Sequence, residues 1–557
     1  MMICTALISL SLFLVFCQTT YAQEKQQSDV RHQETKSCNE FAPPLKQVTG
    51  KSVGVEDCQI ISEETVFNIK GQKFRRVEVR LTGTVEGWVS QQKGSRAIYF
   101  TDGPDFVFAQ FGLRGPRNHG VARYEASTGH GMTIIYPEDP HQWNGKLYIT
   151  AHGAGAYGTV GSLVPRDPKA KFNPLQNVNR YITLMIDKGY AIAHTMRSTD
   201  LTRGDVLVTL DDGTTLKSNL SAHAKLLTTW STLAQSLISK RIGVKPKRTY
   251  FYGHSAGGYL GRLINYQPGA NTDEDGKPIF EGFLIDDAGA GLWLPTLLVD
   301  NRDVLFTTDQ GRKRFVKQID ITHMLYRGES GDFTQKKREN ARLLLEKGLG
   351  TRHRMYEIRG VSHFDAGQVS RSDLVFQTLD LSGLFDALID RLDAWVEEGV
   401  APPPTMSDLA ELGGTNNDGT IKNLAIALPE VACPLGVYYI FPVYYVAPRG
   451  VNAERRGGQE TTFAAFDGTN MEPLDSRGVF VDMNGNGVRD KRETASQAWQ
   501  RLGLLKPGQR LTQGVYTACV NSAASKLVKA GLLPKKVGEY YVEQANKARL
   551  PQLDPSH

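Results

Sequence analysis

The sequence lacks a long apolar run beyond one short stretch near its beginning. Residues 6–16 are apolar and uncharged, and Thr20-Tyr21-Ala22 follows before Gln23, although the first residues lack the usual Lys or Arg. A bilayer span needs about 20 apolar residues, whereas a shorter run before a small-x-small sequence is typical of a secretory signal peptide. The sequence therefore predicts a signal peptide over residues 1–22 and a secreted or periplasmic mature chain without a membrane span.

The chain also has little net excess of positive or negative charge, and it has no internal repeats. The 557 residues carry a formal net charge of only +6. Lys and Arg are dispersed, and Arg455-Arg456 and Lys535-Lys536 are the nearest approach to clusters. Nucleic-acid-binding domains gather basic residues on one face, and solenoids repeat every 20–50 residues or so. We therefore expect no nucleic-acid partner; the oligomeric state is not fixed by the sequence.

Cysteine is rare, with six residues, of which two belong to the predicted signal peptide. The remaining Cys38, Cys58, Cys433 and Cys519 are an even set, which in an oxidising compartment predicts two disulfides. Four cysteines allow three pairings. Proximity in the sequence favours Cys38–Cys58 and Cys433–Cys519.

Four regions follow from the pattern along the chain. The signal peptide precedes a β-rich region over residues 23–125, where alternating residues such as 74–81 predict a small antiparallel layer. Residues 126–400 alternate strands and helices, which predicts a parallel sheet with crossover helices. The Pro-rich segment near residue 403 ends that core, and residues 401–557 form a C-terminal extension that we expect to pack on it and shape the mouth of its pocket. The expected strands are residues 147–150, 190–195, 248–252, 283–286, 319–326 and 355–359, and the expected helices are 222–240, 335–347, 383–398, 494–502 and 512–530.

The segment from residue 248 carries the strongest functional signal. An aromatic, β-prone run leads into Gly253-His254-Ser255-Ala256-Gly257 and then into a helix-like stretch. A serine on a sharp strand-to-helix turn needs glycines two residues before and after it, because neighbouring chain approaches closely there. Ser255 is therefore the predicted nucleophile of a nucleophile elbow.

A second glycine-rich turn precedes this serine by about a hundred residues. His152-Gly153-Ala154-Gly155 follows an apolar strand, as in the loops that supply one backbone N–H to an oxyanion hole. We expect the donors to be the N–H of Ala256 and that of Gly153 or Ala154, each of which would contribute about 3–4 kcal/mol to transition-state stabilisation.

The base and the acid should follow the nucleophile. Among the later histidines, His363 lies in a loop after a strand-like run and is the predicted base. Asp332, in the loop after residues 319–326, is the preferred acid, and Glu329 in the same loop is the alternative. His323 is expected to lie in the preceding strand as a core or rim residue, and Asp365 is too close to His363 to be an independent acid and is expected to cap local backbone.

The order Ser255, Asp332, His363 is that of α/β-hydrolases. The chain also resembles the exported bacterial alpha/beta hydrolase domain family, through Asn-x-Asp-x-x-Gly-x-x-x-Phe-Glu-Gly at residues 271–282, Asn-Asp-Gly-Thr-Ile at 417–421 and Ala-Leu-Pro-Glu-Val-Ala-Cys-Pro at 427–434. The resemblance covers about residues 130–545. It implies the α/β-hydrolase fold and serine ester hydrolysis. The family often has Ser-x-x-Glu-Tyr-Trp near the acid, where this chain has Glu-Ser-Gly-Asp-Phe at 329–333.

Residues 482–493 have the pattern of a calcium-binding loop. Oxygen-bearing side chains stand at loop positions 1, 3, 5, 9 and 12 with glycine at position 6, and a backbone carbonyl is expected at position 7. Arg489 replaces the usual hydrophobic residue at position 8. The predicted ligands of a structural Ca²⁺ are Asp482, Asn484, Asn486, Val488, Asp490 and Glu493.

The sequence thus predicts a serine hydrolase that cleaves a small-molecule or polymer ester through an acyl-enzyme and needs no organic cofactor. A peptidase or thioesterase would use the same triad. A catalytically silent hydrolase fold that binds carbohydrate or a cell-surface polymer through the aromatic C-terminal region is the alternative from another class.

Overall fold

The structure is a computed structural model, which describes residues 36–42, 46–48, 51–68, 70–92, 98–103, 106–109, 119–152, 180–196, 206–209, 215–218, 224–254, 256–266, 271–273, 275–288, 296–299, 302–303, 315–323, 327–328, 331–359, 361, 365, 379–435, 496, 499–500, 502–548 and 550. Among these residues, no helix is both long and apolar enough to cross a membrane.

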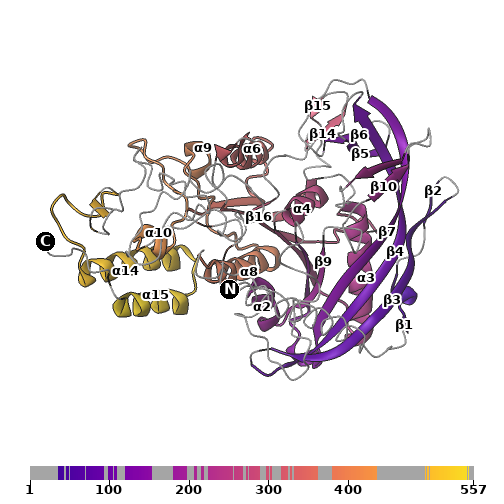
Figure 1. The fold of residues 1–557 in the computed structure, drawn as a ribbon, viewed down its shortest axis with the longest axis horizontal. Helices are drawn as coiled ribbons and strands as arrows, with labels where there is room; N and C mark the ends of the chain where they lie inside the picture. Colours follow the sequence, from indigo (N-terminus) through magenta and orange to yellow (C-terminus); the bar gives the residue numbers. More distant parts are fainter. Residues whose placement is uncertain are drawn as a thin grey trace, which may run out of the picture.

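Six parallel strands form the centre of a large sheet (Figure 1). In spatial order they are β9 (Ala191–Met196), β8 (Lys146–His152), β12 (Arg248–His254), β13 (Gly282–Asp286), β16 (Lys317–Thr322) and β19 (His353–Glu357). All six correspond to predicted strands, with boundaries shifted by a few residues. The α/β fold predicted for this part of the chain is confirmed.

Helices cover both faces of this sheet because alternate strand residues point to opposite sides. On β12, Phe251 packs with α3 (Ala224–Ile242) and α4 (Ala256–Tyr266), whereas Tyr250 packs on the other face with α2 (Arg180–Asp187) and α8 (Ser382–Glu397). Tyr181 of α2 stacks on Phe385 of α8 with ring centroids 3.7 Å apart. Both cores are continuous runs of buried apolar and aromatic side chains.

The N-terminal strands extend the core sheet, whereas the alternation over residues 74–81 predicted a separate small layer. β7 (His119–Pro137) pairs antiparallel with β9 and with β4 (Lys73–Gln92), which pairs with β3 (Lys51–Phe67). These long strands run along one side of the molecule (Figure 1). The disulfide Cys38–Cys58 ties the segment before β3 to that strand, as the spacing of the cysteines predicted.

The C-terminal region packs on the core, as expected. After the Pro-rich segment, residues Met406 and Ile426 form bridges alongside β19. The helices α14 (Gln513–Ala530) and α15 (Lys535–Lys547) lie at the end of the molecule opposite the N-terminal strands (Figure 1). Leu527 and Leu533 join the apolar cluster that includes α8, and the predicted disulfide Cys433–Cys519 joins the end of α10 (Pro429–Ala432) to α14.

Candidate active site

The turn between β12 and α4 has the geometry required of a nucleophile elbow. β12 ends at His254 and α4 begins at Ala256, so a single residue connects strand and helix. A Cβ atom on Gly253 would lie 2.4 Å from the carbonyl oxygen of Gly257, and one on Gly258 would lie 2.8 Å from the carbonyl oxygen of Gly253. Strand and helix therefore approach so closely that a side chain at either position would collide with backbone. Ser255, the predicted nucleophile, lies outside the described residues.

The predicted oxyanion donors are only partly described. Gly253 is paired with Ala151 of β8, so β8 ends beside the elbow. Ala256 is the first residue of α4, where backbone N–H groups lack partners within the helix. Gly153 and Ala154 lie outside the described residues, and the oxyanion assignment stays a prediction.

The structure describes only part of the region that contains the predicted base and the two candidate acids. His363 lies outside the described residues, but its neighbours Val361 and Asp365 are buried. The backbone of Asp332 lies in the short hairpin of β17 (Arg327–Gly328) and β18 (Gly331–Asp332), directly before α6 (Phe333–Glu346). Glu329 and the predicted calcium loop also lie outside the described residues, so the choice between the two acids is open.

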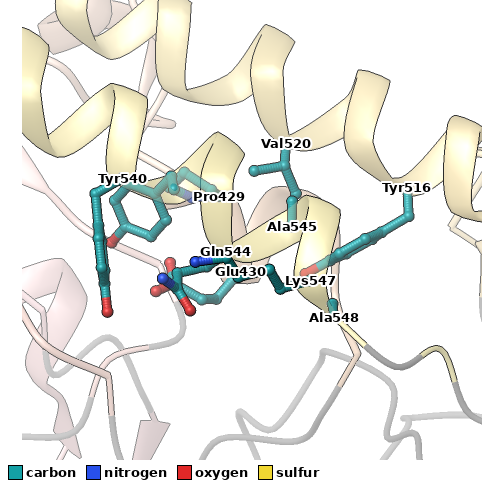
Figure 2. Close-up of a pocket in the computed structure, with 10 residues that line it drawn as sticks. Pro429, Glu430, Tyr516, Val520, Tyr540, Gln544, Ala545, Lys547 and Ala548 are labelled. Atoms are coloured by element: carbon teal, nitrogen blue, oxygen red, sulfur yellow. The ribbon is translucent and has the colours of Figure 1, made fainter.

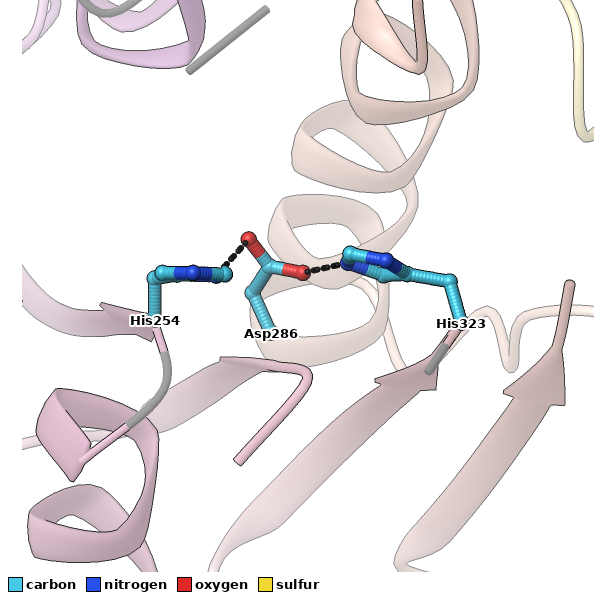
Figure 3. Close-up of side chains that lie close together, drawn as sticks. All are labelled: His254, Asp286 and His323. Atoms are coloured by element: carbon cyan, nitrogen blue, oxygen red, sulfur yellow. Dashed lines mark hydrogen bonds and ion pairs between the residues drawn. The ribbon is translucent and has the colours of Figure 1, made fainter. Parts of the chain in front are cut away.

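The structure reveals a buried cluster at the carboxyl ends of β12, β13 and β16, defined by His254, Asp286 and His323 (Figure 3). Asp286 lies between the two imidazoles. Its Oδ2 accepts a hydrogen bond from His254 Nδ1, and its Oδ1 accepts one from His323 Nε2, both at 3.0 Å. Tyr252 donates a further bond of 3.0 Å to Oδ2. The side chains of all three cluster residues are 0% exposed.

A second acid and a lysine complete the charges around this cluster. Asp287 Oδ1 accepts bonds from the backbone N–H of His323, at 3.2 Å, and from the ammonium of Lys337 in α6. Asp287 has φ of 40°, the only positive φ at a non-glycine residue among those described. Aspartate tolerates this left-handed backbone better than most residues. The two adjacent carboxylates are thus held by donors from β16 and α6.

The pKa values follow from these contacts. Burial alone would raise the pKa of Asp286, but the charges and hydrogen bonds of His254 and His323 outweigh it and hold that pKa below its usual range. Burial alone would lower the pKa of His323, but the carboxylates of Asp287 and Asp286, with a contribution from Asp365, raise it to about 9. The chain therefore carries an ionised aspartate bound to a protonated histidine beside the elbow at neutral pH.

The same three side chains also form a set of metal-ligand types whose donor atoms lie within 4.8 Å of one another. Their geometry fits a hydrogen-bonded bridge better than a metal centre. The carboxylate presents a different oxygen to each imidazole at hydrogen-bond distance, whereas zinc ligands converge on a single ion at about 2.0–2.2 Å. The cluster is therefore a hydrogen-bonded bridge in which Asp286 joins the two imidazoles.

Asp365 lies near this cluster and makes a long-range contact. Its Oδ1 accepts a hydrogen bond from the hydroxyl of Tyr181 in α2, a residue far away in the sequence. Burial raises the pKa of Asp365 to about 7, which the charge of His323 partly opposes. The sequence suggested only local backbone capping for this residue.

A separate groove of about 450 Å³ lies in the C-terminal region, between α10, α14 and α15 (Figure 2). Burial raises the pKa of Glu430 in this groove to about 7. Its Oε2 has no hydrogen-bond partner in the described part of the chain. The lining residues are Pro429, Glu430, Tyr516, Val520, Tyr540, Tyr541, Gln544, Ala545, Lys547 and Ala548.

Sequence reasoning missed the cluster as a unit. His254 was contained in the elbow motif and Asp286 in a predicted strand, and His323 was placed inside a strand that in fact ends at Thr322. Each of the three residues lies at or just after the end of a parallel strand. The carboxyl ends of parallel strands meet at one edge of the sheet, so this position along the sequence could have indicated that the three lie together.

Comparisons with known proteins were made on sequence and on structure. No curated protein matches the sequence significantly. Among solved structures, the chain is similar to Est1E from Butyrivibrio proteoclasticus, with 11% identity, a TM-score of 0.25 and coverage of 48% of this chain and 96% of that one. It is also similar to the poly(3-hydroxybutyrate) depolymerase LpqC from Bordetella parapertussis, with 13% identity, a TM-score of 0.28 and coverage of 51% and 89%. A carboxyl esterase from Tuber melanosporum matches at 12% identity, a TM-score of 0.29 and coverage of 53% and 89%.

These structural likenesses are weak. The family profile is more informative because it covers more than half of the chain. The profile described as "Alpha/beta hydrolase domain" matches residues 223–543. This range contains the elbow, the buried cluster, α14 and most of α15. The chain belongs to the alpha/beta hydrolase domain family.

Proposed function

We propose that the protein is a serine hydrolase that cleaves carboxylic esters with Ser255 as nucleophile, His363 as base and Asp332 as the acid that orients it. The observation that carries this proposal is the close approach of Gly253 to Gly257 around a single connecting residue, which the sequence identifies as serine. A sharp strand-to-helix turn exposes its central side chain at the carboxyl edge of the sheet. Glu329 remains the alternative acid.

The reaction follows from these roles. His363 accepts the proton of Ser255 Oγ while Oγ attacks the ester carbonyl carbon, and the developing oxyanion is held by N–H groups of Ala256 and of Gly153 or Ala154. The bond to the leaving alcohol breaks, and the alcohol takes the proton from His363. Water then attacks the acyl carbonyl carbon while His363 takes its proton. The bond to Ser255 Oγ breaks, the carboxylic acid leaves, and His363 returns the proton to Oγ. No organic cofactor takes part.

A fluorophosphonate probe tests the nucleophile directly, because it reacts only with activated serines. Wild-type protein should be labelled stoichiometrically and Ser255→Ala should not be labelled. Ser525→Ala, which removes an exposed hydroxyl on α14, is the matched control and should be labelled like wild type. A panel of acyl and aryl esters, a thioester and a peptide amide then separates esterase from thioesterase and peptidase activity. Equal labelling of wild type and Ser255→Ala would refute the assignment.

A second candidate function is supported by the groove in the C-terminal region. Its three tyrosines and the carboxyl and amide groups of Glu430 and Gln544 are of the kinds that hold sugar rings, by stacking and by hydrogen bonds. On this alternative the chain binds carbohydrate or a cell-surface polymer and is catalytically silent. Polysaccharide retention that is lost in Tyr540→Ala, together with no turnover of any ester, would favour it.

We further propose that the chain is exported after removal of residues 1–22, and that residues 482–493 bind a structural Ca²⁺. Two disulfides agree with an oxidising compartment. Sequencing the N-terminus of protein recovered from the medium or periplasm tests the first proposal. A mature chain that retains residue 1 would contradict it.

A further inference from the structure

We propose that Asp286 is a positioning residue for the reactive serine, which it holds in place through its bridge to His254 and His323. This inference rests on the proposed function, since it assumes that Ser255 is the nucleophile. It goes further, because it gives a role to three residues that make no contact with substrate in the mechanism above. The bridge is the same one that Figure 3 shows.

His254 stands directly before the serine. It is the last residue of β12 and is bonded covalently to residue 255. Its partner Asp286 is the last residue of β13, directly opposite it in the register of the two parallel strands. A side-chain bond at the last strand residue fixes the direction in which the backbone enters the turn. Because a misplacement of about 1 Å can cost on the order of 100-fold in rate, the orientation of His254 matters for the serine.

Asp286 is itself held in place by bonds from other elements. His323 connects Asp286 to the end of β16, and the backbone N–H of His323 also binds Asp287, which Lys337 holds from α6. Three strands and one helix therefore meet at this bridge. A buried polar network whose members are bonded to one another in a medium of low dielectric is rigid, and removing one member weakens the bonds of the others.

The bridge of His254, Asp286 and His323 depends on the positive charge of His323. Asp286, at the end of β13, and the following Asp287 both face the imidazole of His323. Asp365, in the segment after β19, and His254, at the end of β12, also face it. Lys337 of α6 lies on the other side of Asp287. The protonated imidazole therefore separates the two adjacent carboxylates. The pKa of His323 is about 9, so the bridge should weaken as pH rises through that value. The bridge has its full strength below pH 6.5, the ordinary pKa of histidine. The same titration should produce an alkaline limit to the reactivity of the serine.

Two variants and one control test the proposal. Asp286→Asn removes the charge that both imidazoles bind, and His323→Gln keeps a side-chain N–H donor but cannot titrate. His353→Gln is the control, because His353 is equally buried and bonds Asp320 at 2.7 Å, but it lies at the opposite, amino end of β19. Each protein is labelled with the fluorophosphonate probe and assayed with p-nitrophenyl acetate over a pH range on both sides of 9.

We expect Asp286→Asn to lower the labelling rate and kcat on the order of 100-fold with little change in KM, while the final extent of labelling still reports folded protein. His323→Gln should lose the alkaline limit near pH 9. His353→Gln should lower the melting temperature but keep the wild-type kcat and pH profile, because its bond lies away from the elbow.

The outcomes separate this inference from the proposed function. If Ser255→Ala is not labelled but Asp286→Asn and His323→Gln react at the wild-type rate with the wild-type alkaline limit, the positioning role is wrong and the nucleophile stands. If His353→Gln loses kcat and the alkaline limit to the same degree as His323→Gln, the effect is general destabilisation and the proposal also fails. If Ser255→Ala is labelled like wild type, the proposed function and this inference fail together. Should Asp286→Asn not fold, His323→Gln and its pH profile decide.

Discussion

At the scale of single residues, Gly253 makes the most specific prediction. Its missing Cβ leaves room for the carbonyl group of Gly257, whose carbon and oxygen would lie 2.5 and 2.4 Å from it. Gly253→Ala should therefore force the strand and helix apart, lower the free energy of unfolding by about 1–3 kcal/mol or more, and slow labelling of the serine. Urea unfolding and the rate of fluorophosphonate labelling measure the two effects.

The control for this substitution is Gly514, the second residue of α14. Nothing lies within 4 Å of a Cβ built on Gly514. Gly514→Ala should stabilise slightly, because alanine is favoured over glycine in a helix by about 1 kcal/mol. A neutral Gly253→Ala would show that the turn can relax, which would remove the main geometric support for the elbow.

Asp365 supplies the pH-dependent prediction. Its pKa is raised from 3.8 to about 7 by burial, so the folded chain holds its proton more tightly than the unfolded chain. The resulting stability is fully present below pH 3.8 and is lost as pH rises through about 7. Wild type should therefore lose more unfolding free energy between pH 5 and pH 8 than Asp365→Asn, whose amide can still accept the bond from Tyr181. Asp275→Asn, at a side chain 77% exposed, should behave like wild type.

The sequence identified some residues of the site and missed others for a physical reason. Ser255 and the flanking glycines form a local motif, so short-range spacing was enough to find them. The bridge of His254, Asp286 and His323 depends on which strands are neighbours, and β12, β13 and β16 are separated along the chain by α4 and by other segments. Single-sequence patterns predict strands well but do not give their order across a sheet.

At the scale of elements, the predicted strands and helices succeeded where apolar spacing was strong. β12 and α8 have regular buried positions, and both were found close to their predicted bounds. α15 was not predicted; only Gly538 and Ala545 of its thirteen residues are buried, and neither is a large apolar side chain, so the segment has few of the residues that mark a core-facing helix. No bounds were predicted for β3 and β4, since only part of β4 shows clear alternation.

The loop after β16 gives the prediction that belongs to this scale. A carboxylate that orients the base must stand in the segment between β16 and α6, and Asp332 and Glu329 are the two candidates. Losing the orienting carboxylate can cost up to about 10⁴ in rate. Asp332→Asn should approach this loss in kcat for p-nitrophenyl acetate, and Glu329→Gln should stay near wild type. A large loss in Glu329→Gln alone would reverse the assignment.

At the scale of the whole molecule, the two disulfides should differ in their contribution to stability. Cys433 and Cys519 are 86 residues apart, and Cys38 and Cys58 are 20 apart. In the chain-entropy treatment, closing the longer loop stabilises by about 4–5 kcal/mol and the shorter by about 3 kcal/mol.

Replacing both members of each pair by alanine tests this difference. The Cys433→Ala, Cys519→Ala variant should have the lower urea midpoint of the two, because its unfolded chain gains more freedom. It should also detach α14 from α10 and so disturb the C-terminal groove. A lower midpoint for the Cys38→Ala, Cys58→Ala variant would show that packing of the N-terminal strands, and not loop length, decides the effect.

The predicted calcium loop, residues 482–493, connects the stability of the C-terminal region to its environment. An ion that binds only the folded chain stabilises it by an amount that grows with the logarithm of its concentration relative to its dissociation constant. If Asp482, Asn484, Asn486, Asp490 and Glu493 hold Ca²⁺, EDTA should lower the melting temperature and added Ca²⁺ should restore it. Asp482→Asn should weaken this response.

Turnover of an ester separates a structural ion from a catalytic one. In the proposed mechanism Ser255 and His363 need no metal, so turnover well below the melting temperature should be the same in EDTA and in calcium. An ion that served catalysis would be needed at every temperature, and its removal would abolish turnover without melting the protein. The melting curve could instead respond neither to EDTA nor to calcium, and elemental analysis could find no calcium in protein dialysed against it. These two results together would mean that residues 482–493 form a turn without a metal.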